Sequence, residues 1–181
     1  MKILTWLFIF LLFPLSLCQA KYIASNDGRV VFETDDDWYL TSIGLQKPAV
    51  EILSVACDAD TGLTLARHMY ESEYSSYWEV PYSEKSKIMD RALRFFCNGL
   101  REKGFTVIVN RTDIFGDSIV MDFTLKRGGN VYKCVEIYGL RDYVLYSLQL
   151  VCSEHTKKKA FDVFSSLKID GLPYRIWIAG Y

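Results

Sequence analysis

The sequence predicts an α+β fold, in which an antiparallel β-sheet of about six or more strands is sandwiched with two main helices. Short runs of alternating apolar and polar residues fill most of the chain and are separated by turn signals, as in antiparallel sheets. Two other segments carry apolar residues at helical spacing. Residues 21–181 contain no repeat, linker or low-complexity tract. We therefore expect one domain there, long enough to bury a core without disulfides.

The N-terminus has the pattern of a signal peptide. Lys2 is followed by an apolar run, residues 3–17, that is short for a membrane span and is interrupted by a proline. Small residues suited to cleavage come next, so we expect residues 1–20 to be removed and residues 21–181 to be secreted or periplasmic. Lipid anchoring at Cys18 is the less favoured alternative, because a bulky leucine precedes this cysteine where lipidation signals carry a small residue.

Eight segments have the composition and alternation of β-strands. They are residues 30–33, 39–43, 50–57, 63–70, 105–111, 118–126, 131–138 and 143–152. The acidic segment 58–62 between the third and fourth resembles the start of a calcium loop. It lacks the third acid and the closing glutamate of such a loop, so we expect a hairpin turn instead. No metal or cofactor is expected.

The first helix is predicted over residues 84–103. Ser83 is available as its N-cap and Gly104 as its terminator. Four apolar residues recur at helical spacing along one face: Met89, Leu93, Phe96 and Leu100.

The second helix is predicted to begin after Ser153. Its inward-facing residues are Ala160, Phe161, Phe164 and Leu167. The lysine triplet at 157–159 is expected to form a solvated face of this helix, not a binding site. A short tail, residues 173–178, follows.

The strands between the helices allow a prediction of register. Gly128-Gly129 is typical of a two-residue hairpin turn that pairs Arg127 with Asn130. A second turn centred on Arg141 then places alternate residues of all three strands on one face. These are Ile119, Met121, Phe123 and Leu125, then Tyr138, Glu136, Cys134 and Tyr132, then Val144, Tyr146, Leu148 and Leu150.

Four cysteines follow the expected signal peptide: Cys57, Cys97, Cys134 and Cys152. An even number in an exported chain fits two disulfides, with the pairing unknown. Each cysteine also falls on an expected apolar face, where a free thiol behaves as a small hydrophobe, so both alternatives stay open. The predicted register separates Cys134 from Cys152 by about 13 Å along the strands, which argues against that pair. Asn110 begins a glycosylation sequon, relevant only in a eukaryotic source.

The order of these elements resembles the PsbP family and its Mog-like relatives, which are sandwiches of antiparallel sheet between helices. The closing segment carries most of the resemblance. Tyr143-Val144-Leu145-Tyr146 begins a strand that ends at Cys152. A polar helix start comes next and is followed by Phe161, Phe164, Ser165, Ser166 and Leu167. Asp35-Asp36-Asp37-Trp38 is similar to the family's early Pro-x-x-Trp turn, without the proline. The resemblance implies this fold and a mainly non-catalytic role as accessory subunit, chaperone or adaptor. It does not imply the metal or photosystem contacts of PsbP, whose motifs are absent.

One pair of residues suits catalysis. Cys152 and His155 lie where a strand leads into a helix, a place where a thiol can be activated, with Glu136 or Asp142 as an orienting acid. We favour a core-edge cysteine beside a solvent-facing histidine, because a spacing of three residues is weak evidence. Glu136 as a catalytic acid lacks a second carboxylate, and a rim position or a hydrogen bond from a tyrosine explains it more simply. His68 has no sequence neighbours that would make a metal site.

The best candidate for a binding surface is the loop over residues 71–83. Four aromatic residues lie in it around Glu79, Val80 and Pro81: Tyr74, Tyr77, Trp78 and Tyr82. Aromatic side chains in a loop either pack as a lid over the sheet, which we favour, or form a recognition surface. The same choice applies to three residues of the tail: Tyr174, Trp177 and Tyr181.

These features predict an exported, non-enzymatic binding or accessory protein with a protein or other ligand as partner. The formal net charge is −1, and no basic block exists beyond the lysine triplet, which argues against nucleic acid as a partner. No span is expected after removal of the signal peptide, and the oligomeric state is not predicted. Two alternatives stay open: a small secreted hydrolase that uses the Cys152–His155 pair, and a structural component of the cell envelope.

Overall fold

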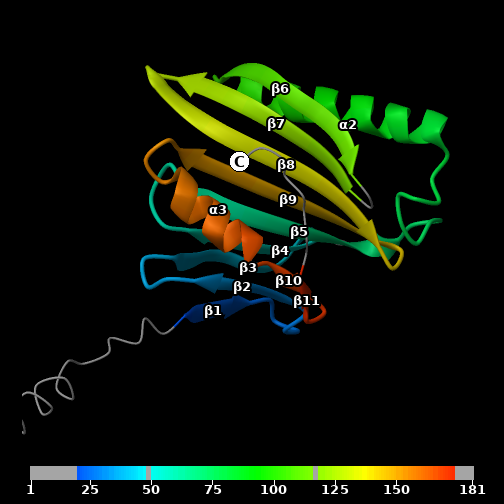
Figure 1. Cartoon of the computed structure of the whole chain (residues 1–181), viewed down its shortest axis with the longest axis horizontal. Helices are drawn as coiled ribbons and strands as arrows, with labels where there is room; N and C mark the ends of the chain where they lie inside the picture. Colours follow the sequence, from blue (N-terminus) through cyan, green and yellow to red (C-terminus); the bar gives the residue numbers. More distant parts are fainter. Residues whose placement is uncertain (1–19, 48–49, 116–117, 174–181) are drawn as a thin grey trace, which may run out of the picture.

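The computed structural model describes residues 20–47, 50–115 and 118–173 (Figure 1). A seven-stranded antiparallel sheet has the order β3-β4-β5-β9-β8-β7-β6. Its strands are β3 (Tyr39–Lys47), β4 (Val50–Ala56), β5 (Gly62–Glu71), β6 (Thr106–Phe115), β7 (Ser118–Arg127), β8 (Asn130–Arg141) and β9 (Val144–Ser153). The expected signal peptide up to residue 19, with Cys18, lies outside the described residues, as do Tyr174, Trp177 and Tyr181.

A smaller sheet has the order β1-β2-β10-β11. Its strands are β1 (Lys21–Ala24), β2 (Val30–Thr34), β10 (Lys168–Ile169) and β11 (Leu172–Pro173). The α+β class and all eight predicted strands are confirmed, although β3 and β6 continue four residues further than predicted. Strands β1, β10 and β11 were not predicted, because Lys21–Ala24 does not alternate between polar and apolar residues and the other two strands are only two residues long.

Two helices cover opposite faces of the large sheet. Helix α2 (Tyr82–Glu102) packs against β6 to β8, whereas α3 (Lys157–Ser165) lies across β9 and β5 on the other face, with the smaller sheet beside it (Figure 1). The predicted N-cap of the first helix is wrong, since Pro81 is the N-cap and its carbonyl oxygen accepts hydrogen bonds from the backbone N–H groups of Glu84 and Lys85. Ser83 lies inside the first turn. Gly104 follows the helix with φ of 83°, as a glycine terminator does.

The first predicted hairpin register is confirmed and the second is wrong. Arg127 pairs with Asn130 around two glycines with positive φ. The next turn is not centred on Arg141, because Arg141 pairs with Val144 around Asp142 and Tyr143. Both turn residues adopt positive φ, 49° and 66°, although neither is glycine or asparagine.

The corrected register reverses the faces of β9, because side chains alternate with a period of two. Glu136 therefore faces Gln149 across the strands, not Tyr146. The residues that we predicted to share a single apolar face are divided between two cores, one on each side of the sheet. One, between the sheets and α3, includes Trp38, Phe32, Leu63, Leu148 and Leu150. The other, under α2, includes Ile119, Met121, Phe123, Leu125 and Cys134.

The cysteines are free thiols in the structure. Cys134 pairs with Val151, whereas Cys152 pairs with Lys133 on the neighbouring position, so these two thiols point to opposite faces of the sheet. Cys97, Cys134 and Cys152 are buried, and Cys57 is half-buried.

Candidate functional site

The loop between β5 and α2, together with the first residue of the helix, is the candidate site. We call residues 72–82 the aromatic loop. Its underside is buried in the core beneath α2, where Tyr77 and Val80 are each only 3% exposed. Its outer side carries Trp78, which is 73% exposed, and Tyr82, which is 81% exposed. Within this one segment, Tyr77 therefore packs over the sheet as the lid prediction expects, whereas Trp78 and Tyr82 face solvent.

Hydrogen bonds hold the aromatic loop in one conformation. The Glu79 carboxylate accepts the backbone N–H of Ser75 at 2.8 Å and its hydroxyl at 2.7 Å. These bonds hold the pKa of Glu79 below its usual value. The Tyr74 hydroxyl donates to Glu84 of the helix at 3.4 Å. The loop is therefore closed on itself before any partner binds.

The turn between β8 and β9 fastens the loop to the sheet. The backbone N–H of Ser72 donates to the carbonyl of Tyr143 at 2.6 Å, and the N–H of Tyr143 donates to the carbonyl of Ser75. Ser76 forms an isolated antiparallel bridge with Arg141. The unpredicted turn thus positions the predicted loop.

Sequence reasoning missed one member of the exposed surface. The Lys85 ammonium lies 5.9 Å from the centre of the Trp78 ring, within the range of a cation–π contact. Pro81 is extended, with ψ of 141°, so the loop and not a continued helix brings Trp78 beside Lys85. No helical spacing in the sequence marks this contact.

A buried carboxyl group lies in the same half of the molecule. Glu136 is 5% exposed, and Gln149 donates a hydrogen bond to its Oε2 atom at 3.2 Å. Tyr138 supplies a second hydrogen bond. Burial raises the pKa of Glu136 to about 8, although both hydrogen bonds oppose the rise. Burial, Glu136 and then Tyr77 raise the pKa of Tyr138, so the loop's underside lies near this group.

The structure separates the groups of the hydrolase hypothesis. Burial raises the pKa of the Cys152 thiol to about 11, opposite to the shift that a thiolate nucleophile needs, whereas His155 is exposed. Glu136 lies on the other face of the sheet from Cys152, and Asp142 lies at the far end of β9. No orienting acid accompanies the pair among these candidates.

The lysine triplet is occupied by ion pairs. Lys157 pairs with Glu154, and Lys158 pairs with Asp162 one turn along the helix. Lys159 pairs with Asp35 and Asp37, the acidic run whose partner the sequence left unidentified. The opposite charges of the lysine triplet and the acidic run, which are distant in sequence, were the feature from which this contact could have been predicted.

Two features are absent from the residues that the structure describes. No group of three histidine, cysteine, aspartate or glutamate side chains is arranged there to hold a metal ion. None of the helices in that part of the chain is long and apolar enough to cross a membrane.

Comparison with known proteins shows the fold. No family model and no curated protein matches the chain. The solution structure of cyanobacterial PsbP (CyanoP) from Synechocystis sp. PCC 6803 matches with a TM-score of 0.58 and 12% identity, over 86% of this chain and 95% of that one. The chain therefore has a PsbP-like fold, as its sequence pattern predicts.

Two further structures match less closely. A protein from Bacteroides thetaiotaomicron VPI-5482 has a TM-score of 0.44 and 8% identity, over 83% of this chain and 48% of that one. A protein of unknown function from Pseudomonas aeruginosa, described as a putative regulator, has a TM-score of 0.36 and 13% identity, over 79% and 94%.

Proposed function

We propose that the chain is an exported, non-enzymatic binding or accessory protein that docks a protein partner through the aromatic loop. One observation carries the proposal: Trp78 and Tyr82 project into solvent from a loop whose intervening residue Val80 is buried. Large aromatic side chains are the residues that most often anchor protein interfaces.

The energetics favour binding at this position. Burying one large apolar side chain against a partner contributes about 1.5–3 kcal/mol. The hydrogen bonds of Ser75 and Glu79 already fix the loop, so association orders little additional backbone. Lys85 adds a positive charge beside Trp78, which suits a partner surface with acidic groups at its rim.

A protein partner fits better than a small molecule. Trp78 and Tyr82 protrude, and a protruding side chain fills a pocket on another molecule, whereas small-molecule sites are concave. The PsbP-like fold supports a role of this kind, because the resemblance implies mainly non-catalytic members.

The experiment replaces Trp78 by a photo-crosslinking phenylalanine and irradiates the protein in its native extracellular or envelope fraction. The matched control carries the crosslinker at Phe95, which is 78% exposed on α2. We expect one protein to be captured from position 78 and not from position 95. Trp78→Ala is then expected to weaken binding of the purified partner at least tenfold, with thermal unfolding unchanged.

Two results would remove the loop from the proposal. One is capture of the same proteins from both positions. The other is unchanged affinity for the identified partner in both Trp78→Ala and Tyr82→Ala. Export is checked separately, by N-terminal sequencing of the protein recovered outside the cytoplasm, with cleavage expected after residue 20.

A further inference from the structure

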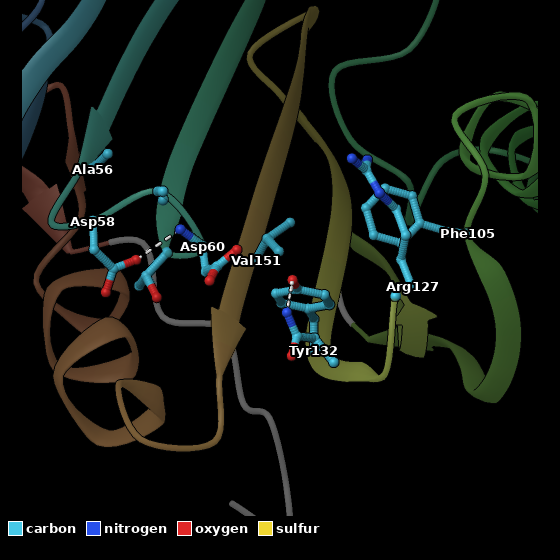
Figure 2. Close-up of a pocket in the computed structure, with 12 residues that line it drawn as sticks. Ala56, Asp58, Asp60, Phe105, Arg127, Tyr132 and Val151 are labelled. Carbon is cyan, nitrogen blue, oxygen red and sulfur yellow. Dashed lines mark hydrogen bonds between the residues drawn. The ribbon is translucent and has the colours of Figure 1, made fainter.

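A pocket of about 490 Å³ lies at the opposite end of the large sheet from the aromatic loop. Three connections meet there: the turn between β4 and β5, the turn between β7 and β8, and the junction of α2 with β6. Figure 2 shows Asp58 and Asp60 on one side of the pocket and Arg127 and Phe105 on the other, with Val151 and Tyr132 between them. Its volume is in the range of sites for small molecules.

The acidic side has one carboxylate held in place and one unused. Asp58 Oδ1 accepts the backbone N–H of Asp60 at 2.8 Å, which fixes the turn (Figure 2). The Asp60 carboxylate is exposed and makes no ion pair or hydrogen bond within the described part of the chain. It is available to a cationic group.

The basic side is built from a stacked guanidinium. The Arg127 Cζ atom lies 5.1 Å from the centre of the Phe105 ring, and Tyr132 packs edge-on against the same ring at 6.1 Å. Among the residues that the structure describes, no acidic side chain pairs with Arg127. The guanidinium is thus oriented by an aromatic face while its N–H groups stay available to a carboxylate.

Two apolar groups, the Val151 side chain and the Tyr132 ring, lie between the two charges. Asn130 donates a hydrogen bond to the Tyr132 hydroxyl at 3.2 Å. That bond uses the hydroxyl as an acceptor, so its own O–H group is left to donate to a ligand.

The span of the pocket sets the length of a ligand. Strands β5 and β7 are three strand spacings apart, about 14 Å. An extended tripeptide covers about 10 Å of this distance, which leaves the remainder to be spanned by the Asp60 and Arg127 side chains together. A free amino acid is too short to reach both charges.

We propose that this pocket binds a short apolar peptide with free termini, placing its ammonium group at Asp60 and its carboxylate at Arg127. An anion such as phosphate fits poorly because two carboxylates face it, and a neutral sugar leaves both charges unpaired. The site is separate from the aromatic loop and independent of the partner proposed there.

The test titrates the purified protein with trialanine by calorimetry and by amide chemical shifts. N-acetyl-trialanine and trialanine amide are the matched probes, since each lacks one terminal charge. We expect saturable binding of trialanine and about tenfold weaker binding of either blocked peptide and of free alanine.

Two variants test which residue binds each terminus of the peptide. Arg127→Gln is expected to weaken trialanine about tenfold and to leave the amide unchanged, whereas Asp60→Asn is expected to leave the N-acetyl peptide unchanged. Lys126→Gln and Asp36→Asn, at exposed positions outside the pocket, should bind like wild type. Trp78→Ala should also bind trialanine normally, which distinguishes this site from the aromatic loop.

Three results would overturn the peptide site. They are the absence of saturable trialanine binding to wild type, equal binding of the free and blocked peptides, and equal losses in the pocket variants and the control variants.

Discussion

The two faces of the large sheet each bury an ionisable residue, and they do so in different ways. On the face beneath α3 and the smaller sheet, Arg67 is paired with Asp27 and Glu51. On the face beneath α2, the partners of Glu136 among the described residues are the neutral side chains of Gln149 and Tyr138. A buried group that keeps its charge needs an opposite charge, whereas one that lacks such a partner becomes neutral near physiological pH.

The pKa values follow this difference. Burial alone would raise the pKa of Asp27, but hydrogen bonds from Ser25, Arg29 and Arg67 hold it at about 2. The hydrogen bonds of Gln149 and Tyr138 also oppose the effect of burial on Glu136, but neither partner is charged, and its pKa rises to about 8. The first group stabilises the fold when ionised and the second when protonated.

Loss of Arg67 should have the largest effect. Arg67→Ala leaves Glu51, whose side chain is 13% exposed, as an uncompensated charge beneath the smaller sheet. We expect the free energy of unfolding to fall by about 3–5 kcal/mol, measured by urea denaturation. The double variant Arg67→Met with Glu51→Gln should recover part of that loss, and failure to recover any of it would show that packing, not charge, sets the cost.

The titration of Glu136 should be visible in the pH dependence of stability. Its folded pKa is raised, so its contribution is complete below the unfolded value near 4.5 and is lost as pH rises through about 8. Stability should therefore fall by about 3 kcal/mol between pH 5 and 8. Glu136→Gln should flatten this dependence, and a slope that persists in the variant would assign the titration to another group.

The titration of Asp27 should be visible in the stability measured at acidic pH. Its folded pKa is lowered, so its contribution is present above the unfolded value of 3.8 and is lost as pH falls through about 2. The effect is discounted because the side chain is 36% exposed. Asp27→Asn should weaken the acid-induced loss of stability relative to wild type.

Truncations in the aromatic loop should separate its two sides. Val80→Ala opens space in the core under α2 and should cost about 2 kcal/mol of unfolding free energy. Trp78→Ala removes an exposed side chain and should change stability by less than about 0.5 kcal/mol. Equal costs would mean that Trp78 packs against the sheet.

A gain in stability, smaller than the cost of Val80→Ala, is expected at the turn that sets the faces of β9. Tyr143 adopts a φ of 66°, which is unfavourable for a residue with a side chain. Tyr143→Gly should stabilise the protein by about 1 kcal/mol in the same urea assay, because its backbone hydrogen bonds to the aromatic loop are kept. Destabilisation would show that the phenol ring contributes to the fold.

Local signals made much of the fold predictable. The strands alternate clearly, and Gly128-Gly129 specifies its own hairpin because both residues need positive φ. Asp142-Tyr143 adopts the same kind of conformation without glycine, so the sequence offered no mark of that turn, and the error of three residues reversed the assigned face of every residue in β9.

The sequence showed which segment forms the candidate site. It did not show which residues of that segment are buried and which are exposed. Which aromatic residues of the loop are buried depends on contacts with β7, β8 and α2, as the burial of Tyr77 shows. The pocket at Arg127 joins three turns that are distant in sequence, and no local pattern connects them. Such sites follow from the topology of the sheet.

The order of strands in the large sheet also bears on how the chain reaches its fold. The strands from β3 to β5 and those from β6 to β9 can each form from neighbouring segments, but β5 pairs with β9 through partners such as Gly62 and Val151. Strand β2 pairs with β10 across a still longer separation. These high-contact-order pairings carry a large loop-closure entropy, so both sheets can be completed only late in synthesis, and folding is expected to be slow with its two halves formed before they join.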